Sequence, residues 1–240
     1  MILAGGVGHR AGTNIPKQFV KVLGKPILAY TLENFQGNEN IDAIEIVCHK
    51  EWVDEVRRIV DVYGIKKTQW IATGGETFQE SVMKGLFHLK GKIDDEDIVV
   101  ISFGVSPMTP KEDVDDSIRI CQAHGNAISA ADIDLCTCVK DDEFSSSQNI
   151  IRETLKGFAN PWTFRFGEVC EVYETALKQG ILETAEPHTT SLYFALGKRV
   201  WFSKCSTSWV KITYQEDIDM FEAYLLLKKH RAILVKRDNQ

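Results

Sequence analysis

Short apolar runs alternate with amphipathic segments through the first half of this 240-residue chain. The apolar runs have the length of buried strands and lie at residues 43–48, 70–73, 98–102 and 126–132. The amphipathic segments carry apolar residues at intervals of three and four and lie at residues 26–35, 51–63, 77–89 and 111–124. This order of elements predicts an α/β fold with a mainly parallel sheet and helices on both faces.

The second half departs from this alternation. Residues 135–158 are polar, lack helical periodicity and predict an extended loop or arm. Beyond them we expect two helices, at 166–177 and 216–229, and two strands, at 199–205 and 210–213. The basic tail at 228–237 is interpreted as a frayed end. No linker or repeat separates a second domain, so residues 1–240 are expected to form one domain with the arm inserted.

The apolar residues 1–4 lead directly into a glycine-rich loop that carries two cations. Gly5, Gly6 and Gly8 are followed by Arg10 and Lys17. Glycine allows a backbone to approach a ligand closely, and successive N–H groups in such a loop bind anions. Because ligands of open α/β sheets bind beyond the carboxyl ends of the strands, the loop predicts a polyphosphate site there.

A dinucleotide-binding loop is the main alternative, since Gly6, Gly8 and Ala11 fit its spacing. That loop must open a helix, however, and Pro16 disfavours helix at the residue before it. The dinucleotide interpretation is therefore rejected.

Composition limits the classes of partner that this protein is expected to bind and the compartment in which it is expected to work. The net charge of −6 argues against nucleic acid as a partner, while the local cations still suit a nucleotide. No apolar run reaches the length of a membrane span, and no secretory signal precedes the loop. The six cysteines lack metal-site spacing. We expect a cytoplasmic protein with reduced thiols and no membrane partner.

The opening motif resembles the nucleotide-binding signature of nucleotidyltransferases. Its residues are Leu3, Ala4, Gly5, Gly6, Val7, Gly8 and Arg10, followed by Pro16, Lys17, Gln18 and Phe19. This combination is most similar to the cytidylyltransferases that act on methylerythritol phosphate and on ribitol phosphate. The resemblance implies a single Rossmann-like nucleotidyltransferase domain. It also implies transfer of CMP from CTP to a methylerythritol, ribitol or glycerol phosphate, with release of pyrophosphate, for isoprenoid or cell-surface polymer biosynthesis.

The resemblance also implies roles for individual residues. Arg10 and Lys17 would hold the triphosphate and stabilise the transition state, and the glycine loop from Leu3 to Gly8 would bind the nucleotide. A second glycine segment with Gly74, Gly75 and Ser81 would contact the cytosine, although a glycine turn before a helix is an equally good interpretation. Arg152 and Lys211 would bind the acceptor phosphate, and each could instead be an ordinary surface residue.

The arm at 135–158 resembles the family's arm that reaches a second subunit, which implies a homodimer; a disordered surface loop is the alternative. The family's magnesium carboxylate is replaced by Phe103, and a family arginine of the cytosine segment is replaced by Phe78. Mg²⁺ is still expected from the family, carried on the triphosphate or held by Asp132 or Asp134, so the metal residues stay unknown. The alternative function is a catalytically impaired nucleotide-binding homologue with a structural or regulatory role.

Overall fold

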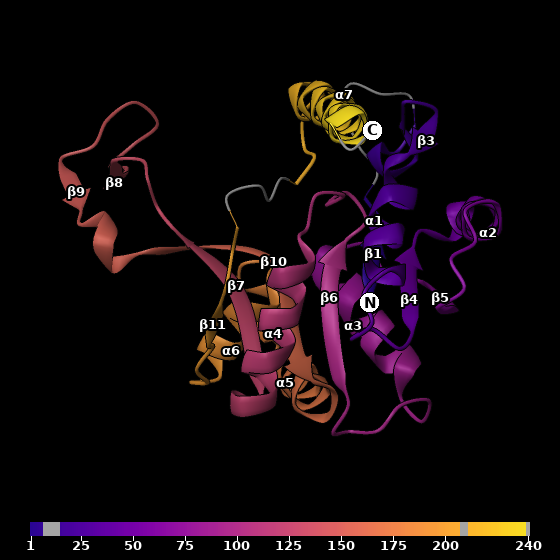
Figure 1. The fold of residues 1–240 in the computed structure, drawn as a ribbon. Coiled ribbons are helices and arrows are strands. Elements are labelled where there is room, and N and C mark those ends of the chain that lie inside the picture. Colours follow the sequence, from indigo (N-terminus) through magenta and orange to yellow (C-terminus); the bar gives the residue numbers. More distant parts are fainter. Residues whose placement is uncertain (7–14, 207–210, 239–240) are drawn as a thin grey trace. The chain divides into compact units, whose positions relative to one another are not determined.

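The computed structural model describes residues 1–6, 15–206 and 211–238, and the chain divides into two compact units. The first unit comprises Met1–His88, Phe103–Met108 and Val210–Gln240. The second comprises Leu89–Ser102 and Thr109–Trp209. Figure 1 shows that both units contain helices and strands. Among the described helices, none is both long and apolar enough to cross a membrane.

Parallel strands form the sheet of the first unit, in the order β1-β4-β5. These strands are β1 (Ile2–Ala4), β4 (Ile44–Cys48) and β5 (Thr68–Thr73). A small antiparallel pair, β2 (Lys21–Val22) and β3 (Lys25–Pro26), follows a short 3-10 helix at Lys17–Phe19. The α-helices of this unit are α1 (Ile27–Gln36), α2 (Val53–Val62), α3 (Phe78–Leu89) and α7 (Gln215–Asp238).

The strands of the second unit follow the order β11-β7-β10-β6. They are β6 (Ile98–Phe103), β7 (Asn126–Asp132), β10 (Lys156–Arg165) and β11 (Phe202–Ser203). β10 is antiparallel to both of its neighbours, whereas β11 runs parallel to β7. The α-helices are α4 (Lys111–His124), α5 (Phe166–Lys178) and α6 (Thr189–Ala195).

The predicted fold class is confirmed. Both strand pairs in the sheet of the first unit are parallel, and the sheet of the second unit combines one parallel pair with two antiparallel pairs. The strand predicted at 126–132 and the helix predicted at 111–124 have the observed bounds. Other predicted elements of the first half differ by a few residues at their ends. The single-domain organisation stays a prediction.

Several predictions for the second half were wrong. The strand predicted at 199–205 is reduced to β11, and residues 211–213 are not a strand. The tail is not frayed, because α7 continues to Asp238. Strand β10 and helix α6 were not predicted, since neither has a clean hydrophobic period.

The polar segment at 135–158 contains a small hairpin. Strand β8 (Thr137–Val139) pairs antiparallel with β9 (Gln148–Ile150), and a 3-10 helix at Arg152–Thr154 leads into β10. Figure 1 shows this hairpin projecting away from the sheet strands of its own unit. An extended arm is therefore observed, while its role in dimerisation stays a prediction.

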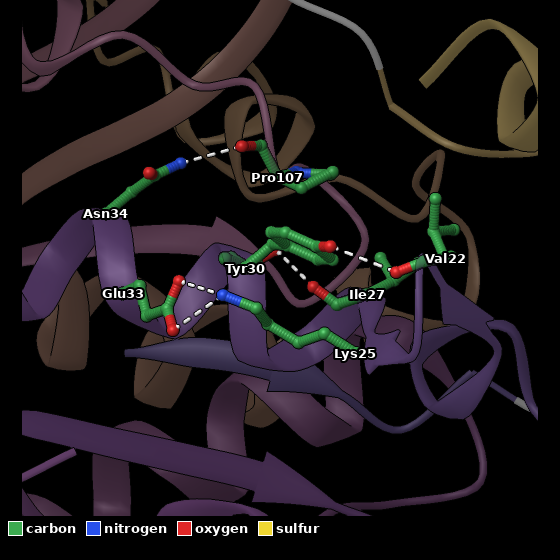
Figure 2. A network of polar contacts seen from close by, with 8 residues as sticks. Val22, Lys25, Ile27, Tyr30, Glu33, Asn34 and Pro107 are labelled. Atoms are coloured by element: carbon green, nitrogen blue, oxygen red, sulfur yellow. Dashed lines mark hydrogen bonds and ion pairs between the residues drawn. The ribbon is translucent and has the colours of Figure 1, made fainter. Parts of the chain in front are cut away.

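Polar side chains from the middle and the C-terminal half of helix α1 contact neighbouring segments, as Figure 2 shows. Lys25 Nζ lies 2.7 Å from a carboxylate oxygen of Glu33, and Tyr30 Oη donates to the Val22 carbonyl at 2.9 Å. Asn34 Nδ2 donates to the Pro107 carbonyl at 2.7 Å. These contacts join α1 to the β2–β3 pair and to the segment that follows β6, which carries part of the candidate site.

Candidate functional site

The glycine loop begins where β1 ends, and the side chain of Gln18 forms hydrogen bonds with the backbone at this point. Gln18 is buried, and its Nε2 donates to the carbonyls of Ala4 at 2.7 Å and Gly6 at 3.0 Å. A Cβ built on Gly6 would meet no atom of the described residues within 4 Å. Gln18 stands within the quoted motif, but sequence reasoning gave it no role. The position of Gln18 in the motif, between Lys17 and Phe19, was the available signal.

Lys17 lies beside the segment that carries Lys211. Its Nζ donates to the carbonyls of Thr213 at 3.1 Å and Ile212 at 3.4 Å. The Ile212 amide in turn donates to the Val105 carbonyl at 2.9 Å. The structure therefore brings two of the predicted phosphate-binding cations to neighbouring segments, beside the continuation of β6.

Ser81 joins the two predicted nucleotide-binding segments. Its Oγ accepts from the Gly75 amide at 3.0 Å, and a Cβ built on Gly74 would come within 2.8 Å of that oxygen. A Cβ built on Gly5 would lie 3.7 Å from the same oxygen. The two glycine segments thus approach each other around one buried hydroxyl. Their role in a nucleotide site stays a prediction.

Two phenyl rings of the first unit lie next to each other, and one of them contacts Lys211. The rings of Phe78 and Phe103 are 5.8 Å apart between centroids and tilted by 48°. Lys211 Nζ lies 4.1 Å from the Phe103 ring centroid, within reach of a cation–π interaction. Phe103 is buried. Phe78 and Phe103, the two residues that depart from the family pattern, are therefore neighbours in space. The ring of Phe103 also contacts Lys211, a predicted acceptor-binding cation.

The side chains described here do not form a metal site. In the described parts of the chain, no group of three or more His, Cys, Asp and Glu residues could hold a metal ion. The phenyl ring of Phe103 offers no oxygen ligand, which Mg²⁺ requires. Asp217 accepts the amides of Thr213 at 2.6 Å and Tyr214 at 2.9 Å. Asp132 pairs with Lys156 at 2.6 Å. A protein-held magnesium ion does not fit this donor set.

Arg152 belongs to the second unit, at the base of the hairpin. Its Nη1 donates to the Asp134 carbonyl at 2.7 Å, and its Nε lies 3.2 Å from Glu153 Oε1. About half of its side chain is exposed. In this chain Arg152 therefore braces the hairpin, and its role at an acceptor site stays a prediction.

The structure gathers most of the predicted site residues in the first unit. They are Leu3, Ala4, Gly5, Gly6, Lys17, Gly74, Gly75, Ser81 and Lys211. Val7, Gly8 and Arg10 lie outside the described residues. A glycine-bordered site at the carboxyl end of a parallel sheet, with lysines beside it, has the chemistry to bind a polyphosphate. Fold and site together define a nucleotide-binding α/β protein.

Comparison with known proteins identifies the family. The family model described as 2-C-methyl-D-erythritol 4-phosphate cytidylyltransferase (IspD) matches residues 1–227. A ribitol-5-phosphate cytidylyltransferase of Lacticaseibacillus paracasei is 34% identical over 229 residues, which are 95% of this chain and 98% of that protein. A 2-C-methyl-D-erythritol 4-phosphate cytidylyltransferase of Clostridium novyi is 33% identical over 227 residues, 94% of this chain and 95% of that protein.

Solved structures agree on the fold. The 4-diphosphocytidyl-2C-methyl-D-erythritol synthase of Anaerococcus prevotii superposes with a TM-score of 0.79 at 24% identity and covers 94% of each chain. The chain thus belongs to the 2-C-methyl-D-erythritol 4-phosphate cytidylyltransferase (IspD) family. It is a nucleotidyltransferase of the cytidylyltransferase type, as the opening motif predicted.

Proposed function

We propose that this chain transfers CMP from CTP to ribitol 5-phosphate and releases pyrophosphate. A phosphate oxygen of the acceptor attacks the α-phosphorus of CTP, and a new P–O–P linkage forms. The bond between the α-phosphorus and the bridging oxygen breaks, and that oxygen leaves with pyrophosphate. The products are CDP-ribitol and pyrophosphate.

The protein's share in this reaction is positioning and charge neutralisation. The glycine backbone at the end of β1 is proposed to bind the nucleotide, and the glycines around Ser81 let the second segment approach it closely. Lys17 and Lys211 lie on adjacent segments, where they would face the negative charge of the two phosphate groups. Arg10 is proposed to join them from the glycine loop.

The acceptor is proposed from one observation: the ribitol-5-phosphate cytidylyltransferase of Lacticaseibacillus paracasei resembles this chain over nearly the whole length of both proteins. The test combines CTP, GTP, UTP and ATP with ribitol 5-phosphate, methylerythritol phosphate and glycerol phosphate, and measures pyrophosphate release. We expect release with CTP and ribitol 5-phosphate. A higher kcat/KM for methylerythritol phosphate or glycerol phosphate would refute the acceptor, and a higher kcat/KM for another nucleotide would refute the base.

We further propose that the enzyme works in the cytoplasm, where CTP is made, as a homodimer in which the arm at 135–158 completes the partner's site. The observation is a projecting hairpin whose base carries Arg152. Arg152→Ala and Lys17→Ala chains are mixed after each has been assayed alone. Sites with both cations should re-form, so the mixture should be more active than either variant. Exchange of subunits without a gain in activity would contradict a shared site.

A catalytically impaired nucleotide-binding protein is the second candidate, and the phenyl ring of Phe103 is the observation that favours it. It predicts that CTP raises the melting temperature by binding the folded chain, while no acceptor yields pyrophosphate. Under this candidate, Phe103→Asp would create turnover where the unmodified chain has none. Turnover by the unmodified chain would exclude it.

A further inference from the structure

Thr213 lies between Lys17 and the first turn of helix α7. Its carbonyl accepts a hydrogen bond from Lys17 Nζ at 3.1 Å, and its amide donates to Asp217 Oδ2 at 2.6 Å. The Tyr214 amide donates to the same carboxylate oxygen at 2.9 Å. Asp217 is the third residue of α7, which begins at Gln215. One carboxylate therefore holds the short segment that the Lys17 ammonium contacts.

Part of this arrangement is an ordinary helix start. An acidic side chain at the third position of a helix commonly accepts the amide of the residue that precedes the helix, which is Tyr214 in α7. The second contact reaches one residue further back, to the Thr213 amide. Thr213 lies outside the helix, and its carbonyl is the one that Lys17 contacts. The hydrogen bonds of Asp217 therefore extend from the helix to the candidate phosphate site.

The first turns of α7 are anchored in the core of the first unit. Ile218, which follows Asp217, and Phe221 are buried, and they share one hydrophobic cluster with Ile212 from the segment before the helix. The Ile212 amide donates to the Val105 carbonyl at 2.9 Å. Because protein cores are closely packed, this part of the helix is a fixed support. Asp217 joins the segment before the helix to that support.

A lysine side chain benefits from such support. Its flexible stem populates many rotamers, and ordering the stem on a ligand costs conformational entropy. Lys17 Nζ contacts the carbonyl of Ile212 at 3.4 Å in addition to that of Thr213. When these carbonyls are fixed, they hold the ammonium near one position before a ligand arrives, and the entropic cost of binding falls.

We propose that Asp217 is a positioning residue for Lys17 and acts through the backbone of Thr213. The proposal rests on the proposed function, in which Lys17 binds the triphosphate of CTP. The sign of the effect separates positioning from simple electrostatics. A carboxylate beside a polyphosphate site repels the ligand, so its removal would strengthen CTP binding if charge were its only influence. Positioning has the opposite consequence: a side chain that cannot accept the two amides weakens CTP binding.

The first test measures the Kd of CTP by calorimetry, at a temperature where a thermal melt shows every variant folded. Asp217→Ala removes the acceptor and should weaken binding about tenfold. Asp217→Asn keeps an oxygen that can accept both amides, so its Kd should stay within about threefold of that of the unmodified chain. The proposal is overturned if Asp217→Ala binds CTP as tightly as the unmodified chain, or if Asp217→Asn binds as weakly as Asp217→Ala.

The matched control is Glu168→Ala. Glu168 is also a half-buried acid at the third position of a helix, but it lies on α5 in the second unit and pairs with Lys198. Its removal should leave the Kd of CTP unchanged. A loss for Glu168→Ala equal to that for Asp217→Ala would show a general effect of weakened helix starts and would overturn the proposal.

The second test asks whether the effect of Asp217 passes through Lys17. In a Lys17→Ala chain, the further change Asp217→Ala should weaken CTP binding by less than about twofold, because the side chain to be positioned is gone. The full loss of about tenfold in that background would overturn the proposal. Hydrogen exchange checks the contact itself: the amides of Thr213 and Tyr214 should exchange faster in Asp217→Ala and at the unmodified rate in Asp217→Asn.

Binding and turnover separate this proposal from the proposed function. If CTP binds with the expected pattern of Kd values but no acceptor yields pyrophosphate, the transferase function is refuted and the positioning role is supported. If the unmodified chain binds no CTP, both are refuted. If pyrophosphate is released and Asp217→Ala leaves the Kd unchanged, the positioning role alone is overturned.

Discussion

The contact between Lys211 and Phe103 can be measured as a coupling free energy. We expect the two side chains to stabilise each other, because Lys211 Nζ lies 4.1 Å from the ring centroid and the ring is buried. Cation–π contacts contribute about 0.5–1 kcal/mol when exposed and about 2 kcal/mol when desolvated. With a half-buried lysine over a buried ring, we expect a coupling of about 1–2 kcal/mol.

A double-mutant cycle isolates this quantity. Phe103→Leu keeps an apolar side chain but removes the ring, and Lys211→Met keeps the stem but removes the charge. The free energy of unfolding in urea is measured for the unmodified chain, both single variants and the double variant. The cavity left by Leu and the lost contact with Phe78 occur on both sides of the cycle, so they cancel from the coupling.

The same cycle also reports on function. If the ring positions Lys211 for an acceptor phosphate, Phe103→Leu should lower kcat/KM by about 5- to 30-fold, since 1.4 kcal/mol corresponds to a factor of ten. Phe103→Leu should then add little to the loss caused by Lys211→Met. The matched control pairs Phe103→Leu with Lys66→Met, an exposed lysine before β5 at the end of that strand away from Gly74. A Phe103–Lys211 coupling as small as that of the control would refute the reasoning.

Three further outcomes follow from other contacts. Gly74→Ala places a Cβ 2.8 Å from Ser81 Oγ and should cost about 1–3 kcal/mol of stability through overpacking, with a smaller thermal shift on adding CTP. Gln18→Leu leaves two backbone carbonyls without their amide donor and should cost about 1–3 kcal/mol in urea unfolding. Burial raises the pKa of Cys170 to about 11, so at pH 8 iodoacetamide should label exposed Cys138 first. Unfolding restores an ordinary thiol pKa, so the stability that this shift provides is lost as the pH rises from about 8.5 toward about 11.

The first half of the fold could be predicted because its elements have clean periods. Residues 111–124 keep an apolar face at helical spacing, and residues 98–102 form an uninterrupted apolar run, so local pattern and observed structure agree. β10 escaped prediction because its pattern is broken by Asn160 and Pro161, at a register shift in its pairing with β7. Its place is set by two neighbouring strands rather than by its own sequence.

The candidate site likewise contains residues that could be predicted from the sequence and residues that could not. The glycines and lysines were predicted from a motif, because glycine and charge have direct chemical meaning. Gln18 was missed because its role is to accommodate two carbonyls that become neighbours only in the folded chain. The contacts of Phe103 with Phe78 and Lys211 could not be predicted either, since each residue lies on a different segment. For α7, the basic tail suggested fraying, whereas the helix continues to Asp238.

The backbone around Phe103 is held by contacts that do not involve its side chain. The Gly104 amide donates to the Leu3 carbonyl at 2.8 Å, and Thr31 Oγ1 donates to the Gly104 carbonyl at 3.1 Å. The Asn34 amide holds Pro107 one turn further along α1. A change at position 103 should therefore alter the chemistry of the site while the segment stays in place.

This makes Phe103→Asp informative, because the new carboxylate would face Lys211 directly, exchanging a ring contact for an ion pair. If the proposed transferase is active as it stands, Phe103→Asp should leave the fold intact and change the dependence of kcat on magnesium concentration. A variant that unfolds instead would show that the ring itself, and not the backbone contacts, holds this segment.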